Sequence, residues 1–564
     1  MIAWNWLFVT VLALVQQGLC SGGDICYLVG SKSAVVNDQL YFFAGNYSTV
    51  SDGAASLYSI ELSDQFPAQR AIPQSALSTH SIDSDASVAY NSAMLTRSAN
   101  SGNVNGAIWN IGDVIYVFGG GFETPNNLVG AYNTSTGEWK DVTVAGGDFN
   151  FGNRFSTQFA TAPGANLGFV YGGSTPYMTG MIRFDASDPN QLSWTNETLT
   201  SGSNGIELPN ISGGTLVYIP AGKEGMLISF GGRNATAGLT SKGWHIESDW
   251  LIIYVYDISS HTWWMQKASG VPPKNRLSFC TAVTTSPDGG AFHITTYGGW
   301  SLEDSRSYED VYVLTIPSFK WINVTDVSNK TNTEWVNSTI GRDTMSGACQ
   351  TYKGSQAIVL GGEIRSGAYS VSKRKCSPVF EPVRVLDLSS YIWRSDLSTT
   401  SSYEVPAVIF AEIGGNASGG ATITTPSAGF ADSTLASLLQ QRAATNISTS
   451  FSSSLSDQNT SHVNSGAIAG GVVGGVAGLA LIAGAAWLLF RSRRSQKHSV
   501  DSKGPLSPHD NVGAQELESQ NMYEAPMHGE TETAELDGAN VLELSGLLPS
   551  VERSPIQNIG LTRI

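Results

Sequence analysis

Positive charge is scarce in this sequence. Its 564 residues include 31 Lys and Arg against 47 Asp and Glu, which gives a net charge of −16, and only 14% of residues are charged. Nucleic-acid-binding proteins usually present a basic surface, so this deficit argues against nucleic acid as a partner. Glycine is abundant, with 61 residues, but it lacks the G-X-Y period of collagen. This glycine content therefore favours turn-rich β structure.

Long apolar runs are also rare and occur at two places. The first, Trp4–Leu19, is followed by small residues between Cys20 and Gly23, which predicts a secretory signal peptide over residues 1–22. An N-terminal membrane anchor is the alternative, although the run is short against the roughly 20 residues that a spanning helix needs.

The second apolar run, residues 466–490, contains no charged side chain and is followed by the basic stretch 491–497. Its length suffices to cross a bilayer core of about 30 Å at about 1.5 Å per residue, and basic residues stay in the cytosol. We therefore expect a single-pass type I plasma-membrane protein with residues 23–465 outside the cell. Residues 491–564 are expected to form a disordered, acidic cytoplasmic tail. GxxxG spacing inside the run permits a homodimer through the span.

Glycosylation sequons give an independent indication of this topology. An N-x-S/T sequence is modified only in an exposed, lumenal loop. All eleven matches precede the apolar run 466–490, which agrees with an extracellular glycoprotein. They lie at Asn46, Asn133, Asn196, Asn210, Asn234, Asn323, Asn329, Asn337, Asn416, Asn446 and Asn459.

Cysteine is scarce as well, with five residues in the chain. Removal of the signal peptide leaves four, and an even number in an oxidising compartment predicts disulfides. Three pairings are possible, and we favour Cys26–Cys376, which joins the two ends of the repeat region, with Cys280–Cys349 as the second bond. Four unpaired, buried thiols are the alternative.

A β-rich run that ends in paired glycines recurs along the chain, as YVFGG, FVYGG, ISFGG, TTYGG and IVLGG, after an earlier copy YFFAGN. Alternating apolar residues predict a half-buried strand, and the glycines end it where the backbone turns or approaches a neighbour closely. Downstream, an Asp or Asn begins a turn and a Trp fills the space between adjacent sheets. The glycines are Gly45, Gly119, Gly120, Gly172, Gly173, Gly231, Gly232, Gly298, Gly299, Gly361 and Gly362, and the tryptophans are Trp139, Trp194, Trp263, Trp321 and Trp393.

This pattern of glycine pairs and spaced tryptophans resembles the kelch repeat. The resemblance implies an all-β fold, a kelch-type β-propeller related to the central domain of galactose oxidase, over residues 23–415. The copies predict six blades, and a seventh is possible because the interval from Gly45 to Gly119 is long. The stretch 403–415 is predicted to be one more strand that closes the ring.

Beyond the repeats, residues 416–465 are rich in Ser, Thr, Gly and Ala. This composition predicts an extended, disordered and O-glycosylated stalk, and a plain flexible linker is the alternative. The whole layout resembles the single-pass membrane kelch proteins of filamentous fungi, whose ligands are generally unassigned.

The resemblance also raises an enzymatic alternative, a copper-radical oxidase of the galactose oxidase type. Such a site uses an adjacent Tyr-His pair among its ligands. None of the histidines before the span follows a tyrosine, so we predict no catalytic residue, no cofactor and no metal site. These histidines are His80, His245, His261, His293 and His462. The acidic pairs Glu303–Asp304 and Glu309–Asp310 suit glycosidase chemistry, but solvated loop charges explain them better.

Long loops on a rigid scaffold commonly carry recognition, and they are the predicted site here. Trp244, Trp300 and Arg306 lie on such loops, and Trp and Arg dominate binding hot spots. Packing beneath a loop is the alternative role for each. We expect a non-enzymatic binding, adhesion or sensing module whose partner is an extracellular protein or, by stacking of aromatic rings on sugars, a cell-wall glycan.

Overall fold

The computed structural model describes a defined set of residues, all of them within the first of the two units of the chain, Met1–Ser452. Signal-peptide, membrane-span and tail predictions fall on residues outside this set. The described residues are 24–25, 28–29, 31–43, 46–47, 57–68, 71–80, 106–118, 128–146, 156–173, 180–197, 206, 208–240, 245–301, 303–330, 349–362 and 382–441. Among them, no helix has the length and apolarity needed to cross a bilayer.

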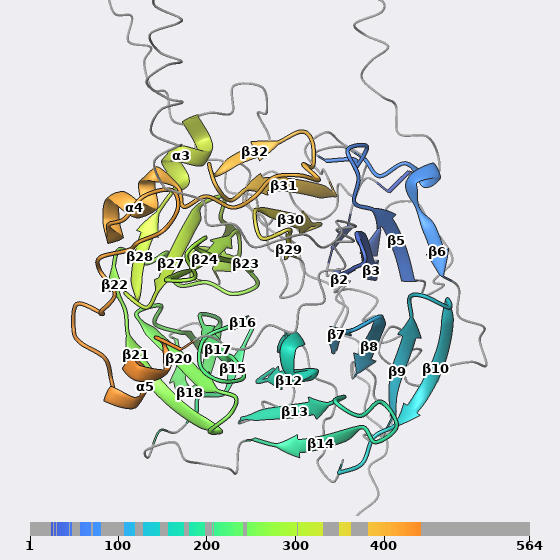
Figure 1. Cartoon of the computed structure of the whole chain (residues 1–564), viewed down its shortest axis with the longest axis horizontal. Helices are drawn as coiled ribbons and strands as arrows, with labels where there is room; N and C mark the ends of the chain where they lie inside the picture. Colours follow the sequence, from blue (N-terminus) through green and yellow to red (C-terminus); the bar gives the residue numbers. More distant parts are fainter. Residues whose placement is uncertain are drawn as a thin grey trace, which may run out of the picture. The chain divides into compact units, whose positions relative to one another are not determined.

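In the part of the chain that the structure describes, six sheets follow one another, each built on four antiparallel strands in sequence order (Figure 1). Sheet 1 contains β2 (Lys32–Val36), β3 (Gln39–Phe43), β5 (Leu57–Glu61) and β6 (Ser78–His80); sheet 2 contains β7 (Ala107–Ile111), β8 (Val114–Phe118), β9 (Leu128–Asn133) and β10 (Glu138–Thr143). Sheet 3 contains β11 (Gln158–Ala162), β12 (Leu167–Tyr171), β13 (Met181–Asp185) and β14 (Ser193–Asn196); sheet 4 contains β16 (Thr215–Ile219), β17 (Met226–Phe230), β20 (Ile252–Asp257) and β21 (Thr262–Lys267). Sheet 5 contains β23 (Cys280–Thr285), β24 (Phe292–Tyr297), β27 (Val311–Ile316) and β28 (Lys320–Asn323), with β22 (Ser269–Gly270) added in parallel to β28; sheet 6 contains β29 (Cys349–Tyr352), β30 (Gln356–Leu360), β31 (Val383–Asp387) and β32 (Ile392–Arg394).

The sheets are arranged around a common centre, as expected for a propeller (Figure 1). The first strand of each sheet contacts the first strand of the next, in the order β2, β7, β11, β16, β23 and β29. Strand β29 also contacts β2, so the first and last sheets meet. A side-chain hydrogen bond joins them, because the Gln350 amide donates to the Ser33 carbonyl at 2.9 Å.

The meander gives the ring two different ends. We call the end that carries the paired glycines the glycine end. The opposite end, where turns join strands 1–2 of each sheet and strands 3–4 of sheets 2 to 6, is the turn end. Predicted Asp and Asn residues do begin turns: Asn133 accepts hydrogen bonds from the amides of Ser135 and Thr136, and Asp387 accepts one from Ser389. Among the described residues, three short sheets extend the glycine end: β1 (Leu28–Val29) with β4 (Asn46–Tyr47), β15 (Ile211–Ser212) with β18 (Arg233–Leu239) and β19 (His245–Glu247), and β25 (Trp300–Ser301) with β26 (Arg306–Ser307).

The paired glycines join neighbouring sheets. The second glycine of a pair donates its amide to the connection that enters the next sheet: Gly173 to Ile211 (2.8 Å), Gly232 to Arg276 (3.0 Å) and Gly362 to Leu28 (3.0 Å). At Gly361 φ is +71°, and a Cβ would lie 2.5 Å from the Leu28 carbonyl oxygen. Only glycine fits such a close approach at positive φ. Gly45, Gly119 and Gly120 lie outside the described residues.

The predicted tryptophans occupy the outermost strands and fill the spaces between sheets, as expected. Trp194 packs on Phe118 (4.6 Å between ring centroids), Trp263 on Tyr171 (5.6 Å), Trp321 on Phe230 (5.3 Å) and Trp393 on Tyr297 (4.8 Å). In each pair the partner is the aromatic residue just before the glycine pair of the preceding sheet. The two motifs of the repeat therefore build one interface.

Two predictions about the region after the repeats are wrong. Residues 403–415 contain no strand: helix α4 (Ala407–Ile413) begins after Pro406 and buries Ile409 and Ile413, four residues apart on one face. Residues 416–441 are not an extended stalk, because helix α5 (Ser433–Leu438) buries Leu435 between sheets 4 and 5.

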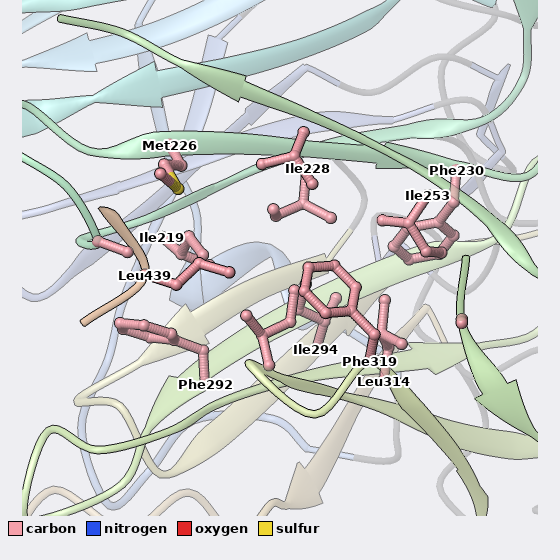
Figure 2. Close-up of a cluster of buried hydrophobic side chains, with 14 of the residues drawn as sticks. Ile219, Met226, Ile228, Phe230, Ile253, Phe292, Ile294, Leu314, Phe319 and Leu439 are labelled. Atoms are coloured by element: carbon pink, nitrogen blue, oxygen red, sulfur yellow. The ribbon is translucent and has the colours of Figure 1, made fainter. Parts of the chain in front are cut away.

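We call residues 403–441 the strap. Leu439 packs beside Ile219, Met226 and Phe292 at the turn end of the same core (Figure 2). Polar contacts also hold this segment. The side-chain amide of Gln266 donates to the Gly429 carbonyl at 3.1 Å, and the backbone amide of Gly420 donates to the Asp288 carboxylate at 2.6 Å. The folded part thus extends beyond the predicted boundary at residue 415. Short helices η1 (Gln74–Ala76), η2 (Pro163–Ala165) and α3 (Thr325–Lys330) complete the described elements.

Candidate functional site

Two of the three predicted ligand-binding residues lie on one hairpin at the glycine end. Trp300 and Arg306 belong to β25 and β26, where Trp300 pairs with Ser307. The backbone of Trp300 also exchanges two hydrogen bonds with Leu277, at 2.8 and 2.9 Å, which ties the hairpin to the connection entering sheet 5. The Arg306 side chain is 47% exposed, and Trp300 is half-buried. Trp244 lies outside the described residues.

Arg276 is a buried residue that holds this hairpin in place, and the sequence pattern did not indicate this role. Its side chain is 2% exposed and forms a two-pronged ion pair with Asp310. The guanidinium also donates to the carbonyls of Lys274 (2.8 Å) and Gly298 (3.2 Å) and lies 3.8 Å from the ring centroid of Tyr308. Asp310 is 34 residues away in sequence, so no local pattern could have indicated the pair.

Replacing Arg276 with lysine tests this support. We expect a loss of about 1–3 kcal/mol in the free energy of unfolding, because lysine keeps the charge but loses the planar, two-pronged pair and the stacking on Tyr308. Urea denaturation of the purified protein measures it. Arg306→Lys is the matched control and should change stability by less than about 0.5 kcal/mol, since Arg306 is exposed. Equal losses in the two variants would contradict the supporting role.

Three carboxylates of this loop, those of Asp304, Glu309 and Asp310, are paired with cationic side chains, which disfavours an acid/base catalytic role for them. The Tyr308 hydroxyl and Lys274 donate hydrogen bonds that lower the pKa of Asp304. A glycosidase needs one carboxyl whose pKa is raised. The ion pairs are Asp304 with Lys274 (3.2 Å), Glu309 with Arg306 (3.0 Å) and Asp310 with Arg276.

The histidines with described side chains have separate partners. His80 contacts the hydroxyls of Ser59 and Tyr132, His261 pairs with the buried Glu197 at 2.8 Å, and His293 contacts the Tyr403 hydroxyl at 2.7 Å. Within the described part of the chain, no three His, Cys, Asp or Glu residues are grouped so that they could hold a metal ion. The side chain of His245 and the whole of His462 lie outside it.

Buried polar residues begin several inner strands at the glycine end, and these were also missed. Lys32 begins β2 and is buried, with its ammonium 4.6 Å from the ring centroid of Phe159; burial lowers the pKa of Lys32 to about 7. Gln158 begins β11 and accepts a hydrogen bond from the Ser229 hydroxyl at 3.0 Å. Among the described residues its buried amide nitrogen has no hydrogen-bond partner. No sequence pattern distinguished these residues from the apolar residues that begin other strands.

The Cys280–Cys349 disulfide, one of the two predicted, is present, with 5.4 Å between the Cα atoms. These cysteines are the first residues of β23 and β29, so the bond links the inner strands of sheets 5 and 6. Cys26 and Cys376, the other predicted pair, lie outside the described residues.

Sequon asparagines with described side chains are accessible to different degrees. Asn323 and Asn416 are exposed, whereas Asn133, Asn196, Asn210 and Asn234 are half-buried. The Asn210 side-chain oxygen is itself buried. Glycosylation of all these positions stays a prediction, and the side chains of Asn46, Asn329, Asn337, Asn446 and Asn459 lie outside the described set.

Comparison with known proteins was made by family model, sequence and structure. No family model matches the chain. A protein described as "Kelch repeat-containing protein", from Arthroderma benhamiae, is 26% identical over 491 residues, which cover 73% of this chain and 66% of the relative. The chain is thus similar to kelch-repeat proteins. The match spans slightly less than two thirds of that kelch protein's length.

A solved structure titled "Structure of YjhT" matches with a TM-score of 0.33 and 15% identity, covering 53% of this chain and 85% of that one. The kelch resemblance does not depend on this weak match. It agrees instead with the repeated architecture of the chain itself, in which glycine pairs and outer-strand tryptophans meet between successive four-stranded sheets.

Proposed function

We infer that this chain is a six-bladed kelch-type propeller that acts as a non-enzymatic binding module, with its ligand held at the glycine end. The observation that carries this proposal is the asymmetry of the two ends. The glycine end carries the three short sheets that extend the loops, including the β25–β26 hairpin. Rigidly supported loops are the usual place for recognition.

The turn end offers less free surface over sheets 4 and 5. Leu435 and Leu439 of the strap are buried there, and the Gly222 amide in the β16–β17 turn donates to the carbonyls of Leu438 and Gln441, each at 3.2 Å. The chain therefore leaves the described region from the turn end.

A cell-surface location is part of the proposal. It combines a signal peptide over residues 1–22, a linker after residue 441, a membrane span over 466–490 and a cytoplasmic tail over 491–564. The support is the apolar runs and the placement of the sequons in the sequence. Protease treatment of intact cells should remove the propeller and leave the tail protected; a protected propeller would contradict this topology.

The binding function predicts that the purified protein captures a ligand on an array of extracellular proteins and cell-wall glycans. Trp300→Ala and Arg306→Ala should each weaken that binding by about 10-fold, because truncation of a hot-spot side chain costs more than about 1 kcal/mol. Surface plasmon resonance measures the affinity. Lys223→Ala is the control: its side chain is 78% exposed in a turn at the opposite end, and its affinity should equal that of the wild type.

Two results would contradict the proposal. A well-folded protein that captures nothing on the array would remove the support for recognition by the propeller. Stoichiometric copper binding with production of peroxide from alcohols or aldehydes would replace the binding function with oxidase activity.

A further inference from the structure

The interface between sheets 5 and 6 differs in chemistry from the three interfaces that join sheets 2 and 3, 3 and 4, and 4 and 5. In sheets 2 to 4, alternate residues of the second strand face the next sheet, and they are apolar or aromatic. Sheet 5 instead places a histidine and a threonine there. Aligned on the glycine pairs, the sets are Val114, Tyr116 and Phe118; Leu167, Phe169 and Tyr171; Met226, Ile228 and Phe230; and His293, Thr295 and Tyr297.

His293 is fully buried in this interface. Its Nδ1 lies 2.7 Å from the hydroxyl of Tyr403, the first residue of the strap, and its Nε2 has no hydrogen-bond partner among the described residues. In the neutral ring one nitrogen accepts and the other donates a hydrogen bond, whereas a protonated ring donates from both. Protonation therefore turns the ring into a buried cation whose Nε2 has nothing in the described interface to bind.

The charged groups around His293 act on its protonation in opposite directions. Arg384 of β31 donates to the Tyr297 hydroxyl at 2.7 Å and brings a positive charge into the same interface. Burial raises the pKa of both Tyr391 and Tyr403, which stay neutral. Asp288, in the β23–β24 turn, favours the cation.

The balance favours the neutral ring in the folded protein. Burial lowers the pKa of His293 from 6.5 to about 4, despite the attraction of Asp288. A group whose pKa falls on folding binds more protons in the unfolded state over that interval. The contribution of neutral, buried His293 to the free energy of unfolding is therefore fully present above pH 6.5 and is lost as the pH falls towards 4.

The interface between sheets 5 and 6 is held by noncovalent packing at the turn end and by a disulfide at the glycine end. At the turn end, Tyr403, Ile409 and Ile413 of the strap pack against sheets 5 and 6, and Lys320 pairs with Glu412 at 2.6 Å. At the glycine end, the Cys280–Cys349 disulfide joins the inner strands of the same two sheets covalently. Loss of noncovalent packing would therefore release the strap side and leave the inner strands attached.

We propose that the interface between sheets 5 and 6 is an acid-sensitive joint, in which protonation of His293 releases the first part of the strap, residues 403–413, while the Cys280–Cys349 disulfide holds the sheets together. The release exposes the apolar face of α4 and the surface it covers. It happens without unfolding of sheet 4, whose strap contact through Leu435 and Leu439 contains no histidine among its described core residues.

Amide hydrogen exchange of the purified full chain, read by mass spectrometry at about pH 7 and about pH 4, tests this joint. After correction for the pH dependence of intrinsic exchange, peptides from 403–413 should lose at least about 10-fold in protection at acid pH, while those from α5 and β23 keep theirs. His293→Gln and His293→Met should abolish this loss. Methionine is the residue at the equivalent position of sheet 4, so a folded variant is expected from at least one of the two replacements.

His80→Gln is the matched control, because His80 also contacts a tyrosine hydroxyl, at 2.8 Å, and burial lowers its pKa. This variant should respond to acid as the wild type does. The Cys280→Ser/Cys349→Ser variant should in addition lose protection in β23 and β29 at acid pH. Three results would overturn the joint. The first is a wild type whose 403–413 peptides keep their protection at acid pH, and the second is a loss of protection in the His293 variants equal to that of the wild type. The third is a simultaneous loss of protection across all peptides. Unchanged protection of β23 and β29 in the double variant would overturn the role of the disulfide.

Discussion

Replacing Gly361 with alanine should lower the free energy of unfolding by about 2–4 kcal/mol. Gly361 has a φ of +71°, and a Cβ there would lie 2.5 Å from the carbonyl oxygen of Leu28. The variant adds left-handed backbone strain to a backbone clash, at the place where sheet 6 meets the segment entering sheet 1. Relief of the clash would move Gly362 away from Leu28 and break their 3.0 Å hydrogen bond.

Gly354→Ala is the control for this prediction, since it isolates the backbone strain. Gly354 lies in the same sheet with a φ of +67°, but nothing lies within 4 Å of the position that the alanine methyl group would take. We expect a loss of about 1–2 kcal/mol, the cost of left-handed backbone alone. Urea denaturation followed by tryptophan fluorescence measures both variants. If the two lose the same stability, the close approach between sheets 6 and 1 contributes nothing.

Truncation of Trp321 to alanine should cost about 3–5 kcal/mol, the usual range for a fully buried tryptophan or phenylalanine. Its side chain is 2% exposed and packs 5.3 Å from Phe230 and 5.4 Å from Trp250, measured between ring centroids. The indole nitrogen of Trp321 also donates a 2.8 Å hydrogen bond to the Trp250 carbonyl. In the alanine variant this carbonyl loses its hydrogen-bond partner. The variant thus removes both apolar packing and a buried hydrogen bond between sheets 4 and 5.

Trp139 offers a comparison at the same position of the repeat. It lies in the outer strand of sheet 2 and packs on Tyr132 with 4.8 Å between ring centroids, but it is only half-buried. Trp139→Ala should therefore cost roughly half as much as Trp321→Ala, since the cost follows the apolar area removed from water. Thermal unfolding monitored by circular dichroism gives both values. A larger loss at Trp139 would show that burial does not set the contribution of the repeat tryptophans.

Much of the fold could be predicted because its signals are local. Alternating apolar residues before Gly172, Gly231, Gly298 and Gly361 predict the second strands, and these strands are present. Strand periodicity depends only on the backbone pleat, and a turn depends on a few neighbouring residues, so both can be seen within about ten residues. Repetition of the same pattern strengthens each weak copy.

The strap could not be predicted in the same way. Residues 403–415 mix apolar and polar positions at spacings that suit either a strand or a helix, and Pro406 can precede both. The helix results from the packing of Ile409 and Ile413 against sheets 5 and 6, residues that are distant in sequence. The Ser, Thr, Gly and Ala content likewise favoured a stalk from residue 416. Composition cannot show that another part of the chain presents an apolar surface on which Leu435 and Leu439 pack.

The candidate site was predicted in part. The long loop of sheet 5 pointed to Trp300 and Arg306, and the structure places both on one hairpin at the glycine end. Arg276 beneath that hairpin could not be found, because its charge is compensated by Asp310, 34 positions later. His293 gave a similar difficulty: its sequence neighbours are those of an ordinary strand, and its partner Tyr403 is 110 positions away.

The sequence by itself determined the repeating unit of this protein: the strand, the glycine pair that ends it, the Asp or Asn turn and the outer tryptophan. Each depends on interactions within a few residues, so it is encoded wherever the motif occurs. Only the tertiary structure decided how the first and last sheets meet through Gly362 and Leu28, where the strap folds back, and which interface buries a histidine. Those outcomes depend on the surface that one segment presents to another far away along the chain, and no short stretch of sequence contains that information.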